Sequence, residues 1–90
     1  MGEIKETLCE IGLENSIVFE NPDYESAIVG FDYNSDRVIY DYDKMVEFLV
    51  TTYSMEPEEA VEFIDVNTIR SLSYMGEKGP IILKTIQDYL

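Results

Sequence analysis

The spacing of apolar and polar residues changes once along the chain, where a strand pattern gives way to a helix pattern. Over residues 37–42 apolar and polar side chains alternate, which is typical of a β-strand with one better-buried face. Over residues 45–53 apolar residues recur at three- and four-residue steps, which is typical of a core-facing helix. The sequence therefore predicts a strand-to-helix joint, at which Asp41 or Asp43 begins the helix by accepting its first amide protons.

The chain before this joint has the pattern of a β-meander. Residues 16–20 and 26–32 are short runs rich in β-branched and aromatic side chains, which favour strands. Turn-forming residues occupy positions 21–23 and 33–36. Because sequential strands usually pair, these two runs and residues 37–42 predict three antiparallel strands.

A short helix is expected near the N-terminus. Ile4, Leu8 and Ile11 fall on one side of it, and Gly12 is a typical helix stop. Cys9 neighbours this apolar side and is interpreted as a small, partly buried residue rather than a reactive thiol.

A further helix is predicted to begin at Pro57, because proline suits the first helical turn and acidic neighbours suit the positive end of the dipole. The apolar face that contains Ile64 does not continue through Val66 and Ile69 if the helix stays straight. Asn67 is a capping residue by type. We therefore expect the helix to break near Asn67 and a short new helix to follow.

The C-terminal part predicts one more short strand at residues 80–83, which could add to the sheet. Residues 84–90 suit either a helical turn or a loose tail. The expected fold for residues 1–90 is thus one small α+β domain. Its three- to four-stranded, mainly antiparallel sheet is packed by the N-terminal helix and by two to three central and C-terminal helices.

Net charge is the strongest compositional feature. Nineteen acidic residues against six basic ones give a formal net charge of −13, while an apolar content of 46% favours a folded domain over disorder. Such a charge disfavours direct binding to nucleic acid or anionic membranes and favours a cationic partner. The same charge can also serve solubility alone, so charge does not decide between the two.

The residue types exclude several kinds of chemistry. With one cysteine and no histidine, an intramolecular disulfide and a Cys/His zinc site are both excluded. We see no glycine-rich phosphate loop and no nucleophile with a recognisable base, so we expect no enzyme activity and no cofactor. No apolar run approaches the roughly 18 residues of a membrane span, and a cytoplasmic setting without a membrane is expected.

One spacing invites comparison with calcium-binding loops. Asp32, Asn34 and Asp36 occupy alternate positions, and Asp43 lies eleven residues after the first of them. The sixth position, however, is Arg37 instead of the glycine that the sharp turn of such loops needs. We therefore expect a solvated hairpin turn and no metal site.

Four segments of the sequence, taken together, are similar to known proteins: residues 40–45, 58–64, 67–70 and 75–82. The chain resembles a group of small, functionally uncharacterised proteins encoded by bacteriophages, prophages and their hosts. Small acidic phage-borne proteins are often inhibitors of host defence, anti-CRISPR proteins among them, and some imitate nucleic acid. The resemblance implies that context and assigns no catalytic residue.

The expected function is that of a non-enzymatic acidic binding protein that occupies a basic surface of a host protein, possible targets being nucleic-acid-handling defence proteins. The alternative is a small structural or assembly protein that oligomerises through a sheet edge; the sequence leaves the oligomeric state open. Tyr24 and Tyr53 are further candidates for aromatic contact area, although tyrosine is more often a core-edge residue. The residues expected to contact the partner are Asp32, Asp36, Asp41, Asp43, Glu56, Glu58, Glu59, Glu62, Tyr33 and Tyr42.

Overall fold

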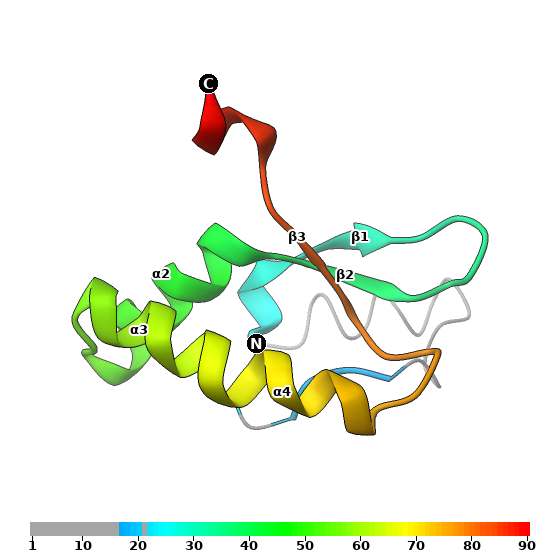
Figure 1. Cartoon of the computed structure of the whole chain (residues 1–90), viewed down its shortest axis with the longest axis horizontal. Coiled ribbons are helices and arrows are strands. Elements are labelled where there is room, and N and C mark those ends of the chain that lie inside the picture. Colours follow the sequence, from blue (N-terminus) through cyan, green and yellow to red (C-terminus); the bar gives the residue numbers. More distant parts are fainter. Residues whose placement is uncertain (1–16, 21) are drawn as a thin grey trace.

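A three-stranded sheet with helices along one side makes up the fold (Figure 1). The computed structural model describes residues 17–20 and 22–90, without the side chains of residues 87 and 88. The predicted N-terminal helix therefore lies outside the described residues. The strands are β1 (Ile28–Phe31), β2 (Val38–Asp41) and β3 (Ile81–Leu83).

Helices fill the connection between β2 and β3. α2 (Tyr42–Tyr53) follows β2 directly, and α3 (Pro57–Phe63), a π-helical turn (Ile64–Thr68) and α4 (Ile69–Ser71) form one continuous helical ribbon (Figure 1). The described residues thus confirm an α+β fold. Short 3-10 turns lie at Glu25–Ala27, Leu72–Tyr74 and Ile86–Tyr89.

The sheet is mixed, with strand order β1-β2-β3. β1 pairs antiparallel with β2, and a bulge between Ile28 and Gly30 interrupts their register. β3 pairs parallel with β2, which is possible because the helices between them supply the long crossover that parallel strands need. The prediction of a mainly antiparallel meander of three consecutive strands was therefore wrong.

The segment predicted as the first strand, residues 16–20, is the reason for that error. Residues 17–20 have no regular secondary structure. Instead, the Phe19 amide donates to the Tyr40 hydroxyl (3.1 Å), and the Phe19 ring lies 4.8 Å from the Tyr40 ring and 5.6 Å from the Tyr24 ring, between centroids. Its aromatic and β-branched side chains therefore serve core packing rather than strand pairing.

The predicted strand-to-helix joint is confirmed. Asp41 ends β2 and caps α2, because its Oδ2 accepts the Lys44 amide proton at 2.9 Å. The other carboxylate oxygen accepts from the Thr85 hydroxyl at 3.4 Å, and only 9% of Asp41 is exposed. A cap of this kind contributes about 1 kcal/mol to helix stability.

The predicted helix break near Asn67 was wrong. The chain stays helical there and inserts a π turn, in which the Ile69 amide donates to the Ile64 carbonyl five residues earlier. One extra residue in the turn rotates the following helix, so that Ile69 and Leu72 pack against the core while Val66 stays 48% exposed. The apolar faces before and after Asn67 do differ in direction, as the sequence indicates. The π turn brings them to the same side of the helix without a capping residue.

The core lies between the sheet and the helices. The Tyr24 side chain crosses it, with its hydroxyl 2.7 Å from the Thr68 hydroxyl of the π turn. Tyr24 also has a left-handed backbone (φ 48°), which is uncommon for a residue other than glycine. Among the described residues, the fully buried ones include Tyr24, Ala27, Val38, Tyr40, Met45, Leu49, Ala60, Ile64 and Pro80.

The C-terminal segment leaves the sheet after β3 and projects away from the rest of the fold (Figure 1). Of the two forms open for residues 84–90, it contains the helical turn, at Ile86–Tyr89. Ile86 and Tyr89 are each 73% exposed. Across the described ranges 17–20 and 22–90, none of the helices has the length and apolar character needed to cross a bilayer.

Candidate partner-binding surface

The first turns of α3 carry a row of exposed carboxylates. Glu56, Glu59 and Glu62 follow each other at three-residue steps and therefore share one side of the helix, and Glu58 lies beside them. Between Lys44 and Arg70 the sequence contains no basic residue. We call Glu56, Glu58, Glu59 and Glu62 the α3 acidic row.

Part of this row also stabilises its own helix. A capping box is formed at the start of α3, in which the Glu56 amide donates to Glu59 Oε1 at 3.4 Å. Carboxylates in the first turn also interact favourably with the helix dipole. All four side chains of the row are nevertheless exposed, so these roles do not prevent contact with a partner.

The predicted contact residues at the start of α2 form interactions within the molecule. Asp43 Oδ1 forms an ion pair with Lys84 Nζ at 3.3 Å, and that nitrogen lies 4.4 Å from the centre of the Tyr42 ring. The Tyr42 hydroxyl donates to Asp65 Oδ1 at 3.2 Å. Partial burial, and then the Asp65 carboxylate, raise the pKa of Tyr42. Asp41 is buried as a cap, and Asp43 is paired with Lys84 although its side chain is 48% exposed. These contacts tie residues 84 and 85 to the start of α2.

The hairpin between β1 and β2 holds the third group of candidates. Asp32 Oδ2 accepts from the Ser35 hydroxyl and the Ser35 amide, each at 2.8 Å, and these bonds lower the pKa of Asp32. Asp36 is exposed and has a left-handed backbone (φ 58°). Tyr33 is 90% exposed at the turn. Within the described residues, no three Asp, Glu, Cys or His side chains are grouped so that they could hold a metal ion.

The structure thus distributes the predicted contact residues over three places. β2 lies between Asp36 and Asp43, and its four residues span about 13 Å at the usual strand rise. Asp36 is therefore not grouped with Asp41 and Asp43. Among the other candidates, Tyr53 is 48% exposed, whereas Tyr24 is fully buried and cannot contact a partner.

A groove that the sequence did not indicate lies between the 17–20 segment and the α3–α4 helix. Its volume is about 470 Å³, within the usual range for binding pockets. Sequence reasoning missed it because the π turn that lines it was interpreted as a break. Residues from both walls include Phe19, Glu20, Phe63, Asn67, Ser71 and Tyr74.

Comparison of the chain with protein-family models, with curated proteins and with solved structures gives no match. The largest group of predicted contact residues that is both adjacent and exposed is the α3 acidic row.

Proposed function

We propose that this protein is a non-enzymatic inhibitor that binds a basic surface of a host protein which handles nucleic acid. The observation that carries the proposal is the α3 acidic row, whose exposed carboxylates lie in a stretch without basic residues between Lys44 and Arg70. Exposed charges of one sign attract a surface of the opposite sign and accelerate its encounter.

The spacing of the row supports competition with nucleic acid at that surface. Residues three apart on an α-helix are separated by about 4.5 Å along its axis, while each strand of a DNA duplex carries one phosphate charge per about 3.4 Å. Glu56, Glu59 and Glu62 therefore present charge at a density similar to that of one nucleic-acid strand. The resemblance to phage-encoded proteins favours a defence protein as the target.

Affinity capture from a host lysate, with and without added Cas proteins, tests the proposal once the captured protein has been identified and its affinity measured. We expect Glu58→Lys with Glu62→Lys to weaken binding about tenfold or more, because two attractive contacts become repulsive. The matched control is Glu47→Lys with Glu77→Lys, which makes the same charge change at exposed positions outside the row. DNA or RNA bound by the target should compete for the same surface.

Equal losses in the two double variants, together with indifference to competing nucleic acid, would contradict the proposal. The acidic row would then serve solubility. Assembly through a sheet edge would become the better function, since the edge strands expose Val29 (46%), Phe31 (40%) and Leu83 (45%). Sedimentation distinguishes that outcome, because assembly gives a mass above the 10.4 kDa of one chain.

A further inference from the structure

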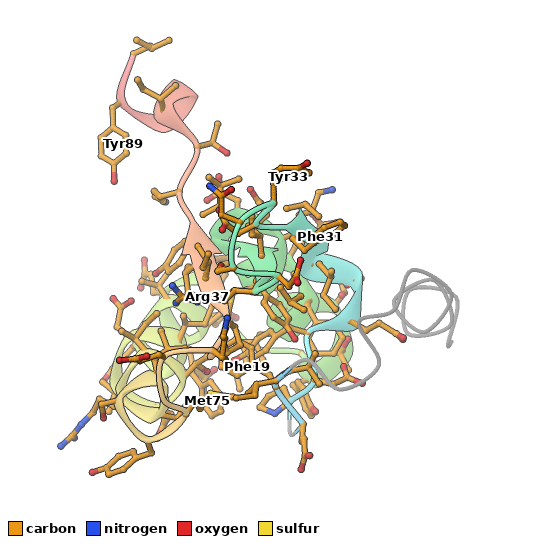
Figure 2. All side chains as sticks on the ribbon, turned by 90° about the vertical axis from the view of Figure 1, so that its right-hand side faces the viewer. Phe19, Phe31, Tyr33, Arg37, Met75 and Tyr89 are labelled. Atoms are coloured by element: carbon orange, nitrogen blue, oxygen red, sulfur yellow. The ribbon has the colours of Figure 1, made fainter. Side chains whose placement is uncertain are left out.

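Two irregular pieces of backbone meet at the groove between the 17–20 segment and the α3–α4 helix. Tyr24, with its left-handed backbone, contacts Thr68 of the π turn through their hydroxyl oxygens at 2.7 Å, and both residues line the groove. π turns and strained non-glycine residues occur frequently at functional sites. Figure 2 shows Phe19 and Met75, from the two walls, close together and far from Tyr33 on the hairpin.

The lining combines aromatic rings with hydrogen-bond acceptors and a carboxylate. Phe19, Phe63 and Tyr74 are the aromatic lining residues besides Tyr24. Tyr74 is 89% exposed and supplies the accessible ring, whereas Phe19 is only 6% exposed because its ring packs against Tyr24 and Tyr40. Glu20 contributes an exposed carboxylate, and no lysine or arginine is among the described lining residues. The lining is therefore complementary to a group that is positively charged at one end and apolar along its length.

Further acceptors are placed on the helical wall. The Ser71 hydroxyl donates its proton to the Thr68 carbonyl at 2.7 Å, which leaves the Ser71 oxygen able to accept a hydrogen bond. The side-chain oxygen of Asn67, an exposed residue of the π turn, is a second acceptor. Without the extra residue of the π turn, Asn67 and Ser71 would be rotated relative to the α3 face.

We infer that this groove binds an arginine side chain of the basic partner. The guanidinium group is planar, stacks on aromatic rings and has five donors for the acceptors of the lining, while its apolar stem suits the remaining wall. Lysine carries a compact, strongly hydrated charge and fits the rings less well. The inference rests on the proposed function for the source of the arginine, and it adds an anchoring contact beside the α3 acidic row, because Phe63 belongs to α3.

The inference is tested by titrating the whole chain with N-acetyl-arginine amide and monitoring the backbone amide signals by NMR. We expect saturable shifts that are concentrated at Phe19, Glu20, Asn67, Ser71 and Tyr74. The lysine analogue should bind at least about threefold more weakly, because it lacks the planar stacking surface. The citrulline analogue is nearly the same shape but uncharged, and it should give no saturable shifts in the groove.

Two variants and two matched controls make the assignment specific. Glu20→Gln and Tyr74→Ala should each weaken arginine binding about threefold to fivefold, through loss of the carboxylate and of the ring respectively. Glu77→Gln and Tyr89→Ala make the same changes at exposed positions outside the groove, and they should leave binding unchanged. All four positions are exposed, so folding is retained and the amide spectrum verifies it.

Shifts that are linear in concentration, or that are spread over α3 and absent from the groove, would overturn the inference, as would equal binding of arginine and citrulline. The proposed function would survive that result, since it depends on Glu58 and Glu62 and on competition with nucleic acid. Conversely, arginine could bind saturably in the groove while the partner's affinity is unchanged by substitutions in the α3 acidic row. That result would support the inference and contradict the proposed function.

Discussion

At the scale of single residues, the tyrosines divide into groups that the sequence does not separate. Tyr24 and Tyr40 are fully buried, whereas Tyr33 and Tyr74 are about nine-tenths exposed, at 90% and 89%. The local pattern places Tyr40 in a half-buried strand and Tyr33 in a turn, but it does not indicate the burial of Tyr24, whose ring contacts the 17–20 segment. Phe19 also contacts the sheet, because its backbone amide donates a hydrogen bond to the Tyr40 hydroxyl. Sequence reasoning therefore identified tyrosines as core-edge or contact residues without finding which role each has.

Burial of Tyr40 predicts a loss of stability at alkaline pH. Burial raises the pKa of Tyr40 to about 12, from an ordinary value of 10.0, with smaller effects from its neighbours. Because the folded-state pKa lies above the unfolded one, the contribution to stability is complete below about pH 10 and is lost as the pH rises toward about 12. Between about pH 9 and about pH 11, the loss from this group is about 1 kcal/mol of unfolding free energy.

Urea unfolding at the two pH values measures this loss. The pKa values of Tyr24 and Tyr42 are also raised, mainly by burial. The wild type should therefore lose more unfolding free energy between the two pH values than Tyr40 alone accounts for. Tyr40→Phe lowers stability at both pH values, since it leaves the Phe19 amide without its partner, but it should show a smaller fall from low to high pH. An equal fall in wild type and variant would show that Tyr40 does not titrate as its burial requires.

At the scale of elements, the local signals predicted most boundaries and the joining of the last strand to the sheet, but not its parallel direction. The capping carboxylate of Asp41 and the first-turn proline of Pro57 are local, and both mark helix starts correctly. The parallel pairing of β3 with β2 joins Ile81 to Ile39 across the helical crossover, which no local pattern specifies. The candidate site follows the same rule, because the α3 acidic row is contiguous in sequence, whereas the groove needs two distant segments and a π turn.

The π turn explains the mismatch of apolar faces that the sequence shows in this helix. In an uninterrupted α-helix, Ile69 would lie about 180° around the axis from Ala60, facing away from the core. The inserted residue returns Ile69 to the core side and leaves Val66 outside. Helix periodicity alone cannot distinguish this insertion from a break, because both remove the same mismatch.

Deletion of Val66 should convert the π turn into a regular α-helix. Removing one residue leaves Ile69 and Leu72 on the core side, since the deletion compensates the insertion. We expect the variant to stay folded, with a melting temperature within about 8 °C of wild type, corresponding to about 1 kcal/mol for a domain of this size. Arginine binding should weaken, because Asn67 would no longer be held in its π-helical position, while Ser71 and Tyr74 keep theirs.

The control deletes Glu47, an exposed residue of the regular helix α2. There the deletion rotates Leu49 away from the core and should unfold the protein or lower its melting temperature severely, because a buried side chain is lost from packing. Thermal unfolding followed by circular dichroism compares the two. Equal damage from both deletions would contradict the view that the π turn is one inserted residue in an otherwise regular helix.

At the scale of the whole molecule, uneven charge dominates. The chain has a formal net charge of −13. Of its six basic residues, Arg37 and Lys84 form contacts within the fold. Arg37 donates to the carbonyls of Gly79 and Pro80 at 2.7 and 3.4 Å, and Lys84 pairs with Asp43 at 3.3 Å. The acidic stretch from Met45 to Ile69 therefore meets little opposite charge within its own sequence, and the folded chain must carry mutual repulsion between carboxylates.

Added salt should consequently stabilise this protein while it weakens partner binding. The Debye length falls from about 10 Å at about 0.1 M salt to about 3 Å at about 1 M, which screens exposed charges from one another. We expect the melting temperature to rise by about 4–8 °C over this range, equivalent to about 1 kcal/mol for a small domain. Binding to a basic partner should become weaker over the same range, because the attraction is screened as well.

The variant with Glu58→Gln, Glu59→Gln and Glu62→Gln removes three of the repelling charges at exposed positions. Its melting temperature should respond less to added sodium chloride than that of wild type, and its binding to the partner should be weak even at low salt. Differential scanning calorimetry and binding isotherms at matched salt concentrations give both quantities. A melting temperature that salt leaves unchanged would mean that the acidic surface is already compensated within the fold, and attraction of a basic partner would then lose its physical basis.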